Sequence, residues 1–232
     1  MHMKRMTHPA SLTPPLLAYN PPSEPYLNVL FEDSHIAVIE KPAGLLSVPG
    51  KAEEHWDCLD YRARQRFGDT RIVHRLDMDT SGLMVLARDA ISLKGLGRQF
   101  EKRKVEKHYI ARVWGHVDQE QGCIDLPLIC DWPNRPKQMV CFERGKAART
   151  DWLVLDRDAV STLVRLTPHT GRSHQLRVHM LSIGHVILGD RFYAEGEALT
   201  SVDRLMLHAE RLSFIHPVKG EWVEFESPRP FP

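Results

Sequence analysis

The sequence predicts an α+β fold in which one mixed, mainly antiparallel sheet carries a few helices. Segments with the composition of strands outnumber helical segments, and the two kinds do not alternate as they do in parallel α/β proteins. The chain has 232 residues, 42% of them hydrophobic and 26% charged, which is the composition of a globular protein with a sizeable core. Because no apolar run approaches the roughly 18 residues of a membrane-spanning helix, we expect no membrane segment.

The first 25 residues are predicted to be a flexible leader. Residues 9–25 contain six prolines and no apolar periodicity, a composition that favours extended or disordered chain. The start of the chain is basic and lacks a continuous apolar segment, so we expect no signal peptide and a cytoplasmic protein. The four cysteines form no CxxC pair, and reduced thiols fit that location. We expect a single domain over residues 26–232.

The first half of this domain contains three predicted strands and two predicted helices. The segment "NVLFEDSHIAVIEKPAG" (28–44) predicts two strands joined by a polar turn. The segment "WDCLDYRARQRFG" (56–68) spaces apolar residues at helical intervals and ends at a glycine. A continuous apolar run, "GLMVLARD" (82–89), is typical of a buried strand, and "AISLKGLGRQFEKRK" (90–104) suits a helix with a basic face.

The second half is predicted to be mostly strand. "KHYIARVWG" (107–115) is rich in β-branched and aromatic residues, and "DWLVLDRDAVSTLVRLTP" (151–168) predicts a hairpin. "SHQLRVHMLSIG" predicts a helix that Ser173 would cap and Gly184 would end. The final strands are expected in "LMLHAERLSFIHP" (205–217) and "EWVEFESP" (221–228).

Positive charge is concentrated in two segments, although the net charge is only +1. Residues 94–107 hold six Lys or Arg against two Glu, and residues 135–149 hold five against one. Such local patches can dock a polyanion, and the alternative interpretation is a solvated surface of no special function.

The stretch "HRLDMDTSG" (74–82) combines two carboxylates with a glycine turn and allows several interpretations. An EF-hand calcium loop would need a Glu at its twelfth position, where the chain has Arg88. A Mg²⁺-dependent aspartyl phosphohydrolase would use Asp77 as nucleophile and Asp79 as acid or base, but the later acidic pair is incomplete at Asp190. The third interpretation is a turn held by local ion pairs.

Five ordered segments, which together span nearly everything after residue 26, resemble the pseudouridine synthases of the RluA family. They are "EKPAGLLSVPG" (40–50), "HRLDMDTSG" (74–82), "EKHYIARVWG" (106–115), "GRSHQLRVHM" (171–180) and "LHAERLSFIHP" (207–217). The segment "LPLICDWPNRPKQ" (126–138) resembles the A-type branch, which acts on both large-subunit (23S) rRNA and tRNA. The resemblance implies the family's catalytic fold, with helices flanking the sheet and an RNA-binding cleft across it.

The resemblance also implies the chemistry: the N1–C1′ bond of a uridine is cut and the uracil is rejoined through C5. This isomerisation needs neither a cofactor nor a metal. Asp77 would be the catalytic carboxylate, and addition to C1′, addition to C6 and removal of the C2′ proton all stay open. Arg177 would keep that carboxylate ionised in a dry pocket, and Tyr109 would stack on the uracil and assist loss of the C5 proton. Asp79 would be replaceable here, whereas the phosphohydrolase would require it.

Contacts with RNA are expected from the motif and from the basic segments. Because a base within folded RNA must be flipped to react, Arg75 resembles the residue that fills the vacated stack. His74 is expected to position the loop or to contact RNA. The other candidate contacts are basic side chains: Lys102, Arg103, Lys104, Lys107, Arg135, Lys137 and Arg172.

We expect a monomer whose partners are 23S rRNA and tRNA stem-loops, with no affinity for DNA or membranes. Many relatives carry an N-terminal S4 RNA-binding domain, for which the leader is too short, so recognition would fall to the catalytic domain. A non-catalytic RNA-binding module remains an alternative, which RNA affinity without turnover would distinguish.

Overall fold

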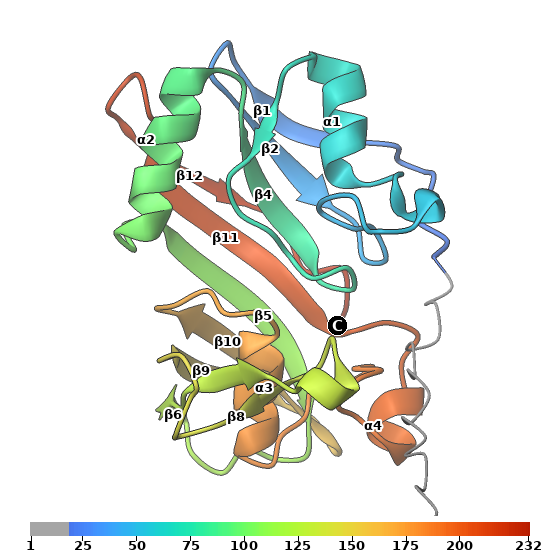
Figure 1. Cartoon of the computed structure of the whole chain (residues 1–232). Coiled ribbons are helices and arrows are strands. Elements are labelled where there is room, and N and C mark those ends of the chain that lie inside the picture. The colour runs from blue at the N-terminus through green and yellow to red at the C-terminus, as the bar shows by residue number, and fades with distance from the viewer. Residues whose placement is uncertain (1–18) are drawn as a thin grey trace, which may run out of the picture.

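The computed structural model describes residues 19–232, which form one ten-stranded sheet and a separate two-stranded hairpin (Figure 1). The strand order is β1-β2-β4-β11-β5-β10-β9-β6, with β12 paired to β11 and β3 paired to β4. Among the described strands only β4 and β11 pair in parallel, so the predicted α+β class with a mixed, mainly antiparallel sheet is confirmed.

The strands are β1 (Asn28–Glu32), β2 (Ile36–Lys41), β3 (Arg71–Ile72), β4 (Ser81–Ala87), β5 (Glu106–Trp114), β6 (Gln121–Asp125), β7 (Leu128–Cys130), β8 (Gln138–Val140), β9 (Arg149–Arg157), β10 (Ser161–Pro168), β11 (Leu207–Ile215) and β12 (Trp222–Glu226). The helices are α1 (Leu59–Phe67), α2 (Ala90–Glu101), α3 (Gln175–Ser182) and α4 (Gly196–Thr200), with short 3₁₀ turns η1 (Glu53–His55) and η2 (Trp132–Asn134).

Most predicted elements are confirmed, and their ends have local causes. The turn between β1 and β2 is closed by Asp33, whose Oδ1 accepts hydrogen bonds from two backbone amides, 2.8 and 2.9 Å away. Asp89 caps α2 by accepting the amide of Ser92 at 2.7 Å, and Gly68 ends α1 with a positive φ of 78°. The strands β3, β6, β7 and β8 and the helix α4 were not predicted, because they are short and lack a regular apolar pattern.

The predicted cap of α3 is wrong. The helix begins at Gln175, and the N-cap position belongs to His174, which has a left-handed φ of 50° and makes no side-chain cap. A non-glycine residue adopts this conformation only when its surroundings enforce it, and here the imidazole of His174 is held by neighbours within the site described below. The predicted end of the helix at Gly184, with φ of 88°, is confirmed.

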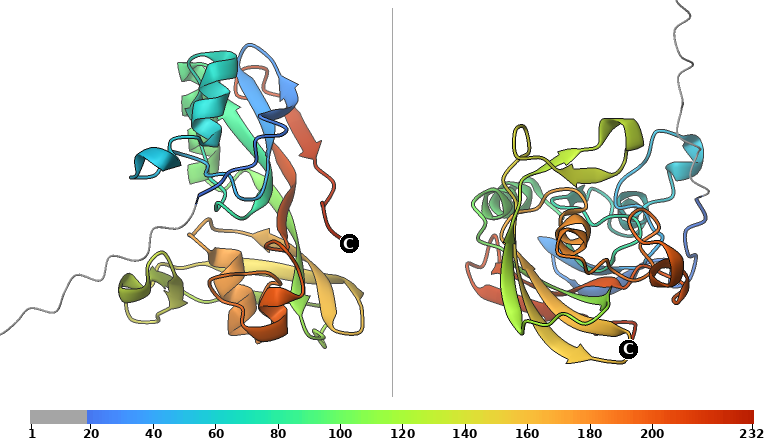
Figure 2. Two further views of the ribbon diagram at one scale, coloured as in Figure 1. Left: turned by 90° about the vertical axis from the view of Figure 1, so that its right-hand side faces the viewer. Right: turned by 90° about the horizontal axis from the view of Figure 1, so that it is seen from below.

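Two lobes share the sheet. In the upper lobe of Figure 1, α1 and α2 accompany β1, β2 and β4, and in the lower lobe α3 and α4 accompany β10, β9 and β6. Strands β5 and β11 run through both lobes, as the turned views in Figure 2 also show. Each lobe has its own apolar cores, and the side chain of Tyr109 in β5 packs against one core from each lobe. The lobes are therefore joined through continuous backbone and not through a linker.

The predicted leader falls mostly on residues 1–18, which lie outside the described residues. Residues 19–25 form no helix or strand, but the hydroxyl of Tyr19 accepts the amide of Leu46 at 3.1 Å and donates to the carbonyl of Asp57. No helix within residues 19–232 is long and apolar enough to cross a membrane.

A glycine permits the parallel contact between β4 and β11. Gly82 has a φ of 112° and pairs with Ala209, and a Cβ atom on Gly82 would lie 2.3 Å from the carbonyl oxygen of Ala209. Both the conformation and the close approach exclude any larger side chain. The last residue of the "HRLDMDTSG" motif is therefore required by the fold.

We expect Gly82→Ala to lower the free energy of unfolding by roughly 2–4 kcal/mol, since it adds backbone strain to a clash with fixed backbone atoms. The matched control is Gly97→Ala in α2, where a Cβ atom meets nothing within 4 Å. That change should leave stability unchanged or raise it by up to about 1 kcal/mol. Urea unfolding followed by circular dichroism measures both, and equal stabilities of the two variants would contradict the assignment.

Candidate active site

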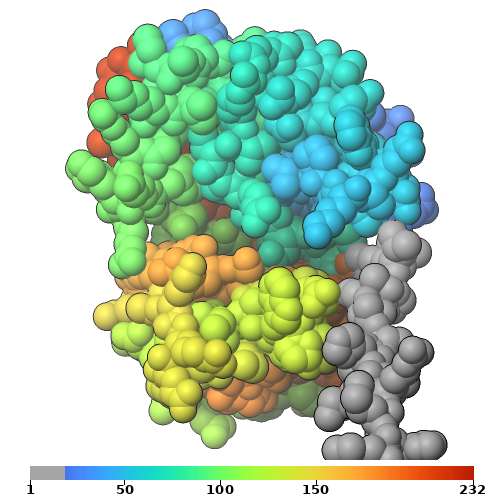
Figure 3. Space-filling view, viewed as in Figure 1, coloured from blue at the N-terminus to red at the C-terminus, as the bar shows by residue number. Residues whose placement is uncertain are grey.

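A cleft of about 1340 Å³ separates the two lobes. The space-filling view in Figure 3 shows it as a groove across the middle of the molecule. Its walls come from the loop 73–80 that precedes β4, the start of β5, the end of β10 and the start of α3. The three predicted catalytic residues, Asp77, Tyr109 and Arg177, all line it.

The loop that carries Asp77 is held from behind by the segment 41–47. Lys41 is fully buried, and its ammonium donates to the carbonyls of Pro42, Leu45 and Met78 at 2.7–2.9 Å. Ser47 donates to the carbonyl of Leu76 at 2.7 Å and accepts its amide at 3.2 Å. Burial lowers the pKa of Lys41 to about 7, although the nearby charges of Asp79 and Asp77 act to raise it. The loop is thus fixed through side chains, because no regular secondary structure satisfies its backbone.

Arg177 lies between two carboxylates. Its Nη1 is 3.3 Å from Oδ2 of Asp77, while its Nε and Nη2 form a bidentate pair with Asp190 at 2.7 and 2.6 Å. Arg177 is 1% exposed and Asp190 0%, whereas the Asp77 side chain is 28% exposed toward the cleft. Burial opposes the charged guanidinium, but the two carboxylates outweigh it and raise the pKa of Arg177 further. The sequence correctly predicted the Asp77 contact and missed Asp190, the stronger partner.

The two residues that follow Asp190 also contact the site. Arg191 pairs with Asp79 through an Nε–Oδ2 distance of 2.8 Å. The ring of Phe192 stacks on His174, with centroids 5.5 Å apart and planes at 25°. Asp79, the essential acid of the phosphohydrolase interpretation, is therefore engaged by an arginine of its own.

Tyr193 connects the site to the hairpin β7–β8. Its hydroxyl lies 2.7 Å from Nδ1 of His174 and accepts the amide of Gln138 at 2.8 Å. The other ring nitrogen of His174 is 3.9 Å from Oδ2 of Asp77. Burial lowers the pKa of His174, partly offset by Asp77, so the imidazole is neutral near pH 7. These contacts explain the left-handed backbone of His174.

Sequence reasoning missed the segment 190–193, although one signal pointed to it. An arginine within the apolar helix sequence "QLRVHML" must be buried, and a buried arginine requires a carboxylate. The chain offers Asp190 shortly after that helix, in "LGDRFY". Its identity as the partner depends on a contact across 13 residues of chain, which no local pattern reveals.

Tyr109 projects from β5 beside Asp77. Its backbone pairs with Leu166 of β10 and with Ala209 of β11, so its position is fixed by strands on both sides. The ring is half-buried and lines the cleft. Burial, and then the charge of Asp77, raise the pKa of Tyr109, so its hydroxyl stays protonated in the free protein.

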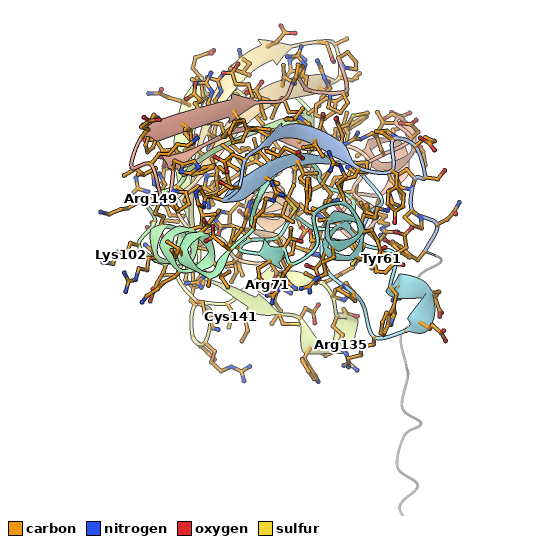
Figure 4. The ribbon with its side chains drawn as sticks, turned by 90° about the horizontal axis from the view of Figure 1, so that it is seen from above. Tyr61, Arg71, Lys102, Arg135, Cys141 and Arg149 are labelled. Atoms are coloured by element: carbon orange, nitrogen blue, oxygen red, sulfur yellow. The ribbon has the colours of Figure 1, made fainter. Side chains whose placement is uncertain are left out.

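The predicted RNA-contacting residues fall into two groups. Those that line the cleft are His74, Arg75, Arg103, Lys107 and Arg172. Lys102, Lys104, Arg135 and Lys137 lie outside its lining. Figure 4 shows Lys102, just beyond the end of α2, and Arg135, on the hairpin, at separate edges of the molecule. Arg75 is exposed two residues before Asp77.

His74 holds the start of the Asp77 loop against β4 and α2. Its Nε2 accepts the amide of Val85 at 3.0 Å, and its ring stacks on Phe100 at 4.6 Å between centroids. Burial, and to a smaller degree Lys107, lowers the pKa of His74 to about 3. Of the two predicted roles, the geometry therefore favours positioning of the loop.

Comparison with known proteins gives these features a context. The family described as RNA pseudouridylate synthase matches residues 35–182, which include the whole motif and the whole of α3. The chain belongs to this family. It is 54% identical, over 92% of its length and 98% of the relative, to the "Dual-specificity RNA pseudouridine synthase RluA" of Escherichia coli K12. It is 51% identical to the protein of that name from Pasteurella multocida, over 93% of this chain and 99% of the relative.

Solved pseudouridine synthase structures share the fold. "Human RNA Pseudouridylate Synthase Domain Containing 1" superposes with a TM-score of 0.75 at 29% identity, covering 88% of this chain and 84% of its own. "Human RNA Pseudouridylate Synthase Domain Containing 4" gives 0.70 at 27% identity, covering 88% of each chain. The protein is thus an RNA-modifying isomerase, as predicted, and the phosphohydrolase interpretation is not favoured.

We expect Asp190→Asn to lower the free energy of unfolding by about 3 kcal/mol, because it removes the main partner of a buried guanidinium. Asp77→Asn should cost about 1 kcal/mol or less, since that side chain is part-exposed and makes the longer contact. Urea unfolding of the two variants tests the difference. The reverse order of stabilities would show that Asp77 is the structural partner.

The low pKa of His74 predicts how stability depends on pH. The unfolded chain protonates this histidine below about pH 6.5 and the folded chain only near pH 3, so the free energy of unfolding falls as the pH is lowered between these values. From about pH 7.5 to pH 5 the loss from His74 should be about 1–2 kcal/mol. His74→Gln retains an oxygen for the Val85 amide and does not titrate, so its urea unfolding should change less with pH. The same pH dependence in both proteins would rule out this role.

Proposed function

We propose that this pseudouridine synthase acts on both large-subunit (23S) rRNA and the tRNA anticodon stem-loop. The two relatives named above carry the words dual-specificity in their names, at 51–54% identity over almost their entire lengths. The observation that carries the assignment of the site is the Asp77–Arg177 pair at the floor of the cleft, 3.3 Å apart. The predicted monomeric state and cytoplasmic location stay predictions from the sequence.

Asp77 is proposed as the carboxylate that acts beside the sugar. Its contacts with Arg177 and His174 both involve Oδ2, which leaves Oδ1 for the uridine. The guanidinium favours the ionised carboxylate as the flipped nucleotide displaces water from the cleft. Addition to C1′, addition to C6 and removal of the C2′ proton all require this ionised form. In each case the N1–C1′ bond breaks, the C5–C1′ bond forms, and the C5 proton is exchanged for one on N1.

The other residues are proposed to receive and hold the flipped base. The ring of Tyr109, fixed between two strands, supplies a face on which the uracil stacks. Arg75 stands exposed at the rim near Asp77, where its planar guanidinium can occupy the vacated position in the RNA stack. The cleft-lining Arg103, Lys107 and Arg172 supply positive charge for the phosphates on either side.

The test is release of tritium from a [5-³H]uridine-labelled anticodon stem-loop in EDTA. The wild type should release tritium, because the C5 hydrogen is lost when the new bond forms. Asp77→Asn should reduce the rate by at least about 100-fold, since it removes the reacting carboxylate. An rRNA stem-loop labelled in the same way tests the second specificity.

Asp79→Ala is the matched control. Asp79 pairs with Arg191 and not with the Asp77–Arg177 pair, so this variant should keep the wild-type rate within about threefold. Release from only one of the two RNAs would limit the proposal to that substrate. Absence of release from both would overturn it, and an Asp79 variant as inactive as Asp77→Asn would overturn the assignment of the reacting carboxylate.

A further inference from the structure

A tryptophan stands exposed at the tip of the hairpin β7–β8. Trp132 begins the turn η2 between the two strands, and 69% of its surface is accessible. Tryptophan is enriched at binding surfaces, because a partner that covers its large ring removes much apolar area from water. This residue lies in the segment 126–138, which resembles the dual-specificity branch.

One face of the Trp132 ring is already occupied by a cation. The guanidinium carbon of Arg135 lies 4.8 Å from the ring centroid, and its Nη1 donates to the carbonyl of Trp132 at 3.2 Å. Within residues 19–232 Arg135 forms no ion pair with an acidic side chain. The pair therefore presents an ordered guanidinium on one side of the indole, while the ring remains largely open to solvent.

The hairpin places this pair beside the cleft. Cys130 and Gln138 form its last backbone pair and both line the cleft, and Trp132 is two residues beyond, at most about 7 Å of extended chain. The amide of Gln138 is bonded to Tyr193 at 2.8 Å, so the hairpin is anchored on the site itself. Figure 2 shows the hairpin projecting away from the sheet, and Figure 4 shows Arg135 at its outer edge.

We propose that the open face of Trp132 stacks on an unpaired base in the loop of the RNA substrate, with Arg135 behind it facing a phosphate. The inference rests on the proposed function, because it names the part of the RNA that the hairpin recognises. Residues 135–149 hold five basic side chains against one acidic, which favours a polyanion over an apolar protein partner. An indole face accepts any base, so one stacking surface suits loops of different sequence.

The test compares the binding of two RNAs by Trp132→Ala: the anticodon stem-loop, and a blunt duplex that has the same length and no unpaired base. Stacking on an aromatic side chain predicts a loss of roughly 5- to 100-fold in stem-loop affinity at fixed salt. Affinity for the duplex should change by less than about twofold, because every basic side chain, Arg135 included, is retained and the duplex offers no unpaired base to stack. Trp132→Phe should recover most of the stem-loop affinity.

Two controls separate stacking from loss of structure. Trp222→Ala removes a tryptophan that is 50% exposed on β12 and does not line the cleft, and should bind both RNAs as the wild type does. With enzyme in saturating excess over RNA, the single-turnover rate constant of tritium release should be the same for Trp132→Ala and the wild type. The loss should appear only in the enzyme concentration that gives half of the maximal rate.

Wild-type stem-loop affinity in Trp132→Ala, or an equal loss for the stem-loop and the duplex, would overturn the inference. Failure of the proposed function gives a different result. In that case the wild type releases no tritium, whereas the binding comparison needs no turnover and still reports whether Trp132 contacts the loop.

Discussion

The site depends on the pairing of the buried Arg177 guanidinium with two carboxylates, those of Asp190 and Asp77. A buried cation is costly unless it is fully paired, and Asp190 satisfies two of its nitrogens while Asp77 takes the third. Because Asp77 lies on a loop of the upper lobe and Arg177 on a helix of the lower lobe, the same pair also joins the lobes across the cleft. The rings of Phe192 and Tyr193 cover the guanidinium, with centroids 5.2 and 5.3 Å from its central carbon. This arrangement leaves one carboxylate oxygen of Asp77 engaged and the other available.

The loop around Asp77 shows how an irregular segment can be rigid. Lys41 satisfies three carbonyls and Ser47 bonds both polar groups of Leu76, so side chains replace the backbone ladder that a strand would supply. His74 extends the same support to the other side through the amide of Val85. Preorganisation of this kind places a catalytic group without the cost of ordering it when substrate binds.

Local patterns were enough to predict the longer strands, but not the short strands or the contacts between distant segments. The apolar runs at 36–41 and 81–87 became fully or almost fully buried strands, because an unbroken apolar run indicates burial on both faces of a sheet. Ser173 does not cap the helix as its position predicts, because the contacts that hold the His174 ring place His174 at the N-cap instead. The contact of Asp190 with Arg177 depends on the tertiary fold. Asp77, Tyr109 and Arg177, which line one cleft, were predicted as catalytic residues through resemblance to a family and not through spacing.

The hydrogen bonds of Tyr19 change where the folded unit begins. Its hydroxyl accepts a hydrogen bond from the amide of Leu46. The neighbours of Leu46 both support the Asp77 loop: the carbonyl of Leu45 accepts from the Lys41 ammonium, and Ser47 bonds Leu76. A residue that precedes the first strand therefore forms the outermost layer of support for the Asp77 loop. A shortened chain that starts at Tyr26 contains every strand and helix described within residues 19–232 but lacks the Tyr19 hydrogen bonds. The proline-rich composition that resembles a linker thus includes part of the scaffold of the site.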